Sequence, residues 1–497
     1  MGQSGIAAFS NAPVFEGLLA LTPDYGCGPR LALAWERRSL NTWRFWLRPN
    51  VRFHNGTAFD ADAAVSTING WGEGPNLMAL GPRSARAVDR STIDVTPIRP
   101  NLRLPEQLTH PGRRMVAPGT VPGVGSSVGN RPTGTGPFRF TSYRHDVGLE
   151  VARFDQYWGE RSALDTITWQ FWRGDNRRLT ALLADDVDAI YDVPRHRIAV
   201  LDGYPALRVA TADVGMYCAL LLNFRGRHPY DLLADVRVRR AIALAVDREA
   251  IVRAWGGGAT PDPTLVPAAV LGRWAGAVAG HPHDPDEAAR KLDAAGWRRG
   301  RDGIRRRFGR SLVLRGLIYS LAEQRRAPAM VASQLARVGI RLELAEPHPH
   351  DYGDLLRRGE GDVFLSVGNQ ADANPLFLAS LFTGVSPGGI PSYGARFGPG
   401  FAFDDLVLAA YATPDAVEVR RLTAAALRVV VDEEVTAVPL GSVARMFALH
   451  DRVHGFLAHP AKGAQIWSGV SLDTQRASDD TRPRSACGPS GREEAVR

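Results

Sequence analysis

The stretch that decides the fold runs from Leu220 to Val252 and reads LLLNFRGRHPYDLLADVRVRRAIALAVDREAIV. An apolar run from Ala219 to Leu222 ends at the polar Asn223, which predicts a buried strand whose end reaches a loop. Asp235 stands at a helix N-cap position, because apolar residues recur behind it at helical spacing. Asp247 starts a second helix in the same way. A strand followed by two capped helices is typical of an α/β protein.

Length and composition indicate a globular protein with more than one domain. The chain has 497 residues, too many for one ordinary core, and is 44% hydrophobic and 23% charged. It contains no uninterrupted apolar run of about twenty residues, so we expect no membrane span.

The net charge of +8 raises the question of a nucleic-acid or anionic-surface partner. Lys291 and Lys462 are the only lysines, so nearly all positive charge is arginine, as a GC-rich genome would produce. The densest basic cluster, from Arg298 to Arg310, is interrupted by Gly and Asp. This pattern favours a solvated loop or hairpin over a phosphate-binding patch, and we expect no nucleic-acid partner.

Several segments resemble one known family, and they occur in the family's order. They are VFEGLL (14–19), TWRFWLRPNVRFHNGTAFDADAAV (42–65), GTGPFRFTSY (134–143), FDQYWGERSALDTITWQF (154–171) and the stretch from Asp235 to Val252. Together they resemble the family 5 extracellular solute-binding proteins, which are the dipeptide, oligopeptide and nickel receptors of ABC importers. The resemblance implies an α/β, two-lobed type II periplasmic-binding-protein fold of cluster C, with a hinge between the lobes.

The resemblance also predicts how the chain is divided. Lobe I would be discontinuous, made of residues 1–222 and 438–475, and lobe II would be residues 223–437. Residues 476–497 are polar and without periodicity, so we expect a disordered tail. Within the family pattern, VFEGLL would form an opening helix. A late helix is expected with Thr413 as its cap and Pro414 as its first residue.

Motifs of catalysis and of cofactor binding are absent from the sequence. There is no Gly-x-Ser-x-Gly elbow, no P-loop and no His-Glu-x-x-His helix, and the glycine-rich GVGSSVG (123–129) lacks dinucleotide spacing. We therefore predict no catalytic residues and no cofactor. Two His-Pro-His pairs, at 281–283 and 348–350, could each supply two imidazoles to a metal ion. Each leads into a helix with a following Asp as its cap, so we prefer no metal site.

The segment VGNQADANPLFLASLF (367–382) is the best candidate for ligand contact, because it follows a predicted buried strand. It resembles the peptide receptors' "G-W-x-x-D-x-x-D-P", whose first aspartate anchors a peptide's α-ammonium group. Asp372 stands at the matching position, Asn369 replaces the tryptophan, and Asn374 takes the place of the second acidic residue. The alternative, equally weighted, is that Asp372 is a turn residue before Asn-Pro.

A second candidate contact is LTHPGRRMVAP (108–118). It resembles a segment that holds a cleft arginine in the nickel branch of the family. His110 stands at the matching position, with Arg113 close behind. The alternatives are a carboxylate-bearing ligand beside His110 or Arg113 and a surface turn at His110-Pro111, of which we prefer the turn.

The predicted function is that of a monomeric receptor of an ABC importer. It would bind a peptide or a similar small cationic or zwitterionic solute in an interlobe cleft by hinge closure, and would deliver it to the membrane subunits of a permease. The resemblance places it outside the cytoplasm, in the periplasm or on the cell surface. The start MGQSGIAAFSNAPVF, however, lacks the features of a signal peptide. The alternative is therefore a cytoplasmic enzyme on this scaffold, acting in a biosynthetic pathway.

Overall fold

The largest element of the computed structural model is a seven-stranded sheet. The structure describes residues 13–71, 85–97, 100–119, 132–144, 146–172, 174–318, 326–383, 397–459, 461 and 465–473. The strands follow the order β10 (Ala189–Tyr191), β19 (Ala437–His450), β11 (Leu207–Leu222), β18 (Val363–Asn369), β16 (Val313–Ile318) and β17 (Arg341–Ala345), and β12 (Ala259–Thr260) pairs with β19. The predicted strand from Ala219 to Leu222 is the end of β11 and is buried.

Helices cover both faces of this sheet. Leu220 and Leu222 lie in one core cluster with α6 (Val236–Ala245), α7 (Arg248–Trp255), α9 (Pro285–Ala294) and α10 (Arg326–Arg337). Ala219 and Leu221 point to the opposite face, toward α11 (Pro349–Arg358), α14 (Phe401–Ala412) and α15 (Ala416–Arg428), as the period of two in a strand requires. The strand is thus buried on both faces, which explains its continuous apolar sequence.

The predicted helix starts in this half are confirmed by their caps. The side chain of Asp235 accepts from the N–H of Arg237, and that of Asp247 from Ala250. Asp284 accepts from the N–H of Glu287, with Pro285 as the first residue of α9. Each cap satisfies a backbone donor that the helix itself leaves without a partner.

The other half is built from smaller sheets. A four-stranded sheet has the order β3 (Ala32–Ser39), β4 (Thr42–Leu47), β6 (Thr92–Val95) and β5 (Ala85–Asp89), and it packs against α2 (Ala61–Asn69). A three-stranded sheet has the order β7 (Phe138–Arg144), β8 (Gly148–Arg153) and β9 (Thr166–Gln170). Smaller elements are β1 (Leu19–Leu21), β2 (Cys27–Pro29), α3 (Leu104–Gln107), α4 (Asp175–Leu183), α5 (Ile198–Leu201), β20 (Val453–His454) and β21 (Ser471–Leu472).

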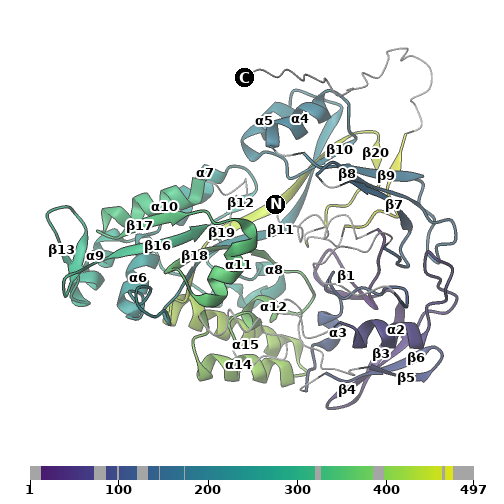
Figure 1. Ribbon diagram of the computed structural model, residues 1–497, viewed down its shortest axis with the longest axis horizontal. Helices are drawn as coiled ribbons and strands as arrows, with labels where there is room; N and C mark the ends of the chain where they lie inside the picture. Colours follow the sequence, from purple (N-terminus) through teal and green to yellow (C-terminus); the bar gives the residue numbers. More distant parts are fainter. Residues whose placement is uncertain are drawn as a thin grey trace, which may run out of the picture.

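Two long strands run between these halves (Figure 1). β11 and β19 pair antiparallel from Leu207 opposite His450 to Leu221 opposite Ala437. Their register shifts between Ala212 and Met216, where the ladder is locally interrupted. Both chain crossings therefore lie in one two-stranded ribbon, a geometry that suits bending between the halves.

The predicted helix at VFEGLL and the predicted cap of the late helix are wrong. VFEGLL forms no helix: Leu19 begins β1, Gly17 bridges to Arg114, and the buried carboxylate of Glu16 accepts hydrogen bonds from distant side chains. The cap of α15 is Asp415 rather than Thr413, which closes the preceding helix α14. One oxygen of Asp415 accepts from two backbone N–H groups, and a carboxylate is the stronger acceptor at a helix N-terminus.

Some predictions fall on residues that the structure does not describe. These are the tail at 476–497 and the loop GVGSSVG at 123–129. Within the described ranges, no helix combines the length and the apolar character needed to cross a membrane.

A buried carboxyl group at the edge of β18 makes the stability pH-dependent. Burial raises the pKa of Asp362 to about 6, although one oxygen accepts from the N–H of Arg315 at 2.9 Å. The other oxygen is buried without a hydrogen-bond partner. Because the folded-state pKa lies above the ordinary value, the free energy of unfolding should fall as pH rises from about 4 to about 6, by roughly 3 kcal/mol.

Asp362→Asn should abolish this fall, since the amide is neutral and keeps an acceptor for Arg315. The variant should match the wild type near pH 4 and be more stable at pH 7, by roughly 1–3 kcal/mol. Urea unfolding at a series of pH values measures the difference. A parallel fall in both proteins would show that the carboxyl group is not its source.

Candidate ligand-binding site

The loop after β18 places Asp372 in the interior. Asp372 and Asn374 are completely buried. One carboxyl oxygen of Asp372 accepts from the backbone N–H of Asn374 at 3.0 Å, while its other oxygen is buried without a hydrogen-bond partner. The side chain of Gln370 donates to the carbonyl groups of Asp372 and Asn374, at 2.9 and 2.7 Å. These hydrogen bonds fix the conformation of the loop, and the second carboxyl oxygen of Asp372 takes part in none of them.

The surroundings of Asp372 disfavour the charged form of its carboxyl group. Burial raises the pKa of Asp372 well above its ordinary value, and the charge of Glu106 raises it further, while Arg113 opposes both effects. Burial in turn lowers the pKa of Arg113 to about 10, and Asp372 counteracts this change. An organic cation beside the second carboxyl oxygen of Asp372 would lower the pKa of this group and favour its ionised form.

His110 and Arg113 lie on the turn that follows α3. A turn is present at His110-Pro111, with the N–H of Arg113 donating to the carbonyl of His110 at 2.8 Å, but it is not the predicted surface turn, because His110 is only partly exposed and Arg113 is buried. The Nδ1 atom of His110 accepts from the N–H of Gly112, so Nε2 carries the hydrogen. Burial and the charges of Arg113 and Arg114 lower the pKa of His110 to about 3. His110 is thus neutral and packs against Phe377 with 5.7 Å between ring centroids.

Arg113 is the cationic group of this turn. It is buried, and its guanidinium lies 4.9 Å from the ring centroid of Trp71. Its charge acts on Asp372. The two residues are 259 positions apart along the chain and come close because the two halves meet here. Of the predicted site residues, the structure brings together His110, Arg113, Asp372 and Asn374. Asn369 is the last residue of β18, opposite Met216 of β11.

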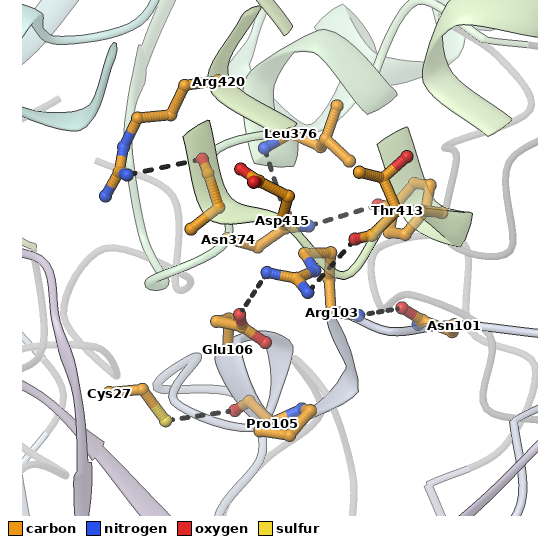
Figure 2. A network of polar contacts seen from close by, with 12 residues as sticks. Cys27, Asn101, Arg103, Pro105, Glu106, Asn374, Leu376, Thr413, Asp415 and Arg420 are labelled. Carbon is orange, nitrogen blue, oxygen red and sulfur yellow. Dashed lines mark hydrogen bonds and ion pairs between the residues drawn. The ribbon is translucent and has the colours of Figure 1, made fainter. Parts of the chain in front are cut away.

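A hydrogen-bond network joins the two halves beside Asp372, and Figure 2 shows part of it. Thr109 Oγ1 accepts from the N–H of Ala373 at 2.9 Å. The hydroxyl of Tyr411 accepts from the side chains of Gln107 at 3.1 Å and Asn374 at 3.2 Å. Further contacts are Asn101 to Gln107, Leu102 to the carbonyl of Tyr411, and Arg103 to Glu106 and to the carbonyl of Thr413. We call these contacts the interlobe network.

The sequence did not identify Tyr411, Gln107 or Thr109 as members of this site. The only signal was indirect: Tyr411 is the one residue with a polar group in the second half of its helix, LVLAAYA, and a buried tyrosine hydroxyl requires a partner. The identity of that partner depends on how the halves meet, which no local pattern encodes.

Tyr411→Phe should weaken the interlobe network. It removes the acceptor of two buried amide groups, on Gln107 and Asn374, at an expected cost of about 1–3 kcal/mol in the free energy of unfolding. Urea unfolding measures this loss, and small-angle X-ray scattering should show a larger radius of gyration as the halves separate. Tyr143→Phe, at an exposed tyrosine, is the matched control and should change neither. Identical behaviour of the two variants would contradict the assigned role.

The metal hypothesis rested on the His-Pro-His pairs at 281–283 and 348–350. In the described part of the chain, no three side chains of histidine, cysteine, aspartate or glutamate lie close enough together to hold a metal ion. Asp284 is the cap of α9 as predicted, whereas Asp351 lies inside the first turn of α11 and does not precede it.

Two halves joined by a two-stranded crossing, with a buried carboxyl group where they meet, form a two-lobed α/β structure. Residues 27–389 match the model of the bacterial extracellular solute-binding proteins, family 5. The chain belongs to this family. The predicted two-lobed α/β fold is confirmed.

The chain is also similar to individual proteins, in sequence to one relative and in fold to solved structures. The chain is 28% identical over 268 residues to the glutathione-binding protein GsiB of Pectobacterium atrosepticum; the match covers 52% of this chain and about half, 51%, of that one. NikA from Brucella suis, solved with Fe(III)-EDTA, has a TM-score of 0.78 at 23% identity, covering 94% of this chain and 95% of that one. The periplasmic binding protein DppA from Helicobacter pylori, solved with the peptide STSA, has a TM-score of 0.75 at 18% identity, covering 94% and 93%.

Proposed function

We propose that the chain is the solute-binding receptor of an ABC importer, and that it binds a small peptide or another solute with a cationic amino group. The observation that carries the proposal is the completely buried Asp372, whose second oxygen has no hydrogen-bond partner at the junction of the two halves. A buried acceptor without a partner is costly, and an ammonium group would satisfy it with a charge-assisted hydrogen bond. The amino group of a peptide supplies such a cation.

The proposed lobes are residues 1–222 with 438–475, and residues 223–437. The hinge would be the ribbon of β11 and β19, which carries the register shift near Ala212. The interlobe network then belongs to the closed state, and separation of the lobes would give the solute access to Asp372. Closure excludes water and strengthens the interaction between the carboxylate and the ammonium group.

The proposal extends to the partners and the location. A closed receptor of this family would present the surfaces of both lobes to the membrane subunits of a permease, as a monomer and outside the cytoplasm. The relatives GsiB and DppA are described as binding proteins, which favours a receptor over an enzyme on this scaffold.

The test begins with mass spectrometry of what co-purifies with the folded protein. Dipeptides with a free amino group and their N-acetylated forms are then compared by isothermal titration calorimetry. We expect the free amine to bind and the acetylated peptide to bind at least about tenfold more weakly, because acetylation removes the cation. Equal affinities, or chemical turnover of a bound compound, would overturn the proposal.

A further inference from the structure

The basic cluster of the sequence folds as the predicted hairpin. Its strands are β13 (Arg298–Arg299), β14 (Arg305–Arg307) and β15 (Arg310–Ser311). The buried Arg305 fixes the hairpin to the body of the protein through hydrogen bonds to the carbonyl groups of Trp297 and Val338 and an ion pair with Asp293. Figure 1 places β13 at the outer edge of the helix-rich half, far from α3 and α12 (Phe377–Ser380) at the candidate site.

The tip of this hairpin presents an aromatic ring to solvent. Phe308 and Gly309 form the two-residue turn, with φ angles of 49° and 75°. Both central residues of such a turn have positive φ, which Asn and Gly adopt easily and a bulky residue does not. Phe308 is nevertheless 89% exposed, so its ring does not pack into the core. The fold itself would be served better by Asn at this position.

Positive charge surrounds the exposed ring. Residues 298–311 contain seven arginines and one aspartate. The guanidinium of Arg307 lies 4.9 Å from the ring centroid of Phe308. Arg306 pairs with Asp302, and Arg310 with Asp231. Among the described residues, no carboxylate forms an ion pair with Arg299, Arg301 or Arg307, so the surface beside the ring keeps an excess of positive charge.

We propose that this hairpin tip binds the surface of an anionic phospholipid bilayer, which reverses the expectation from the sequence that the basic cluster is not a phosphate-binding patch. A convex tip cannot enclose a small ligand, but a single protruding ring can enter the headgroup region while the arginines beside it contact phosphate groups. Aromatic residues favour this interfacial zone, and basic residues near it are attracted by anionic lipid. The contact would hold the receptor at the membrane surface without occupying the candidate ligand site.

The test uses the whole protein and two kinds of vesicle, one of phosphatidylcholine alone and one in which part is replaced by phosphatidylglycerol. We expect sedimentation with the anionic vesicles only, and its loss at high salt. Phe308→Asn should reduce this binding by about tenfold, while its unfolding midpoint stays equal to or above that of the wild type, because Asn tolerates the positive φ. Phe401→Ser is the matched control: Phe401 is 86% exposed but lies beside Asp404 and Asp405, and its loss should leave binding unchanged.

Three outcomes would overturn the proposal. Failure to bind anionic vesicles would show that the tip contacts a protein partner or solvent alone. Equal binding by Phe308→Asn and the wild type would reduce the contact to nonspecific charge attraction. An equal loss in Phe308→Asn and Phe401→Ser would show that any exposed ring suffices. Solute affinity, measured in the same variants, should not change, so the outcome is independent of the proposed function.

Discussion

Asp372→Asn is expected to lower the affinity for a peptide with a free amino group by about 30- to 1,000-fold, which corresponds to roughly 2–4 kcal/mol. The asparagine keeps an oxygen for the N–H of Asn374 but cannot ionise, so the charge-assisted hydrogen bond is lost. Calorimetric titration of the wild type and the variant with one dipeptide measures the change. The variant should also lose the preference for the free amine over the N-acetylated form.

Stability gives this prediction a second, independent readout. Because burial raises the pKa of Asp372 and so disfavours its charged form, replacing the carboxyl group by a neutral amide should leave the unfolding midpoint of the ligand-free protein unchanged or higher. Glu106→Gln is the control for the local electric field: it removes a nearby negative charge without touching the loop after β18, and should change affinity only a few-fold. A large loss of affinity in both variants would show that the local electric field causes the loss, and would contradict direct contact between the peptide's amino group and Asp372.

The parts of the fold that could be predicted are those with local causes. The caps Asp235, Asp247 and Asp284 were correct because a carboxylate at an N-cap bonds to a backbone N–H two or three residues later. The predicted cap Thr413 was wrong because Asp415, two residues further on, offers the stronger acceptor.

The parts that could not be predicted depend on contacts between distant residues. VFEGLL resembles the opening helix of the family, yet the carboxylate of Glu16 accepts hydrogen bonds from side chains of residues 30, 135, 157 and 158. Gln107 and Tyr411 are separated by 304 positions and meet only because the halves close on each other. Resemblance to the family suggested Asp372 and His110 as candidates, whereas no local pattern predicted the network that surrounds them.

The interlobe network explains how a solute at Asp372 would favour closure. Asp372 and Asn374 share one loop, held by Gln370, and Asn374 contacts Tyr411, which also binds Gln107 of the other half. A ligand that fixes the position of Asp372 therefore also fixes a donor of the network. The free energy of ligand binding and that of closure are coupled through this loop, and each should strengthen the other.

Glu16→Ala is expected to be the most destabilising single change considered, at roughly 3–5 kcal/mol in the free energy of unfolding. The carboxylate of Glu16 is buried and accepts from four side chains, at distances between 2.6 and 2.9 Å: Arg30, Thr135, Tyr157 and Trp158. Alanine leaves all four donors without this acceptor and leaves the partly buried guanidinium of Arg30 without its ion pair. Urea unfolding followed by tryptophan fluorescence measures the loss.

The matched control is Glu36→Ala, which removes another glutamate paired with arginine, but at the surface. Glu36 lies 2.7 Å from Arg38, and both side chains are about half exposed. Solvent screens that pair, so its loss should cost less than about 1 kcal/mol. Glu16→Gln should fall between the two, because an amide retains one acceptor oxygen but presents a donor where two donors already point. If Glu16→Ala cost no more than Glu36→Ala, the buried carboxylate would not organise the start of the chain, and the failure of the predicted helix at VFEGLL would need another cause.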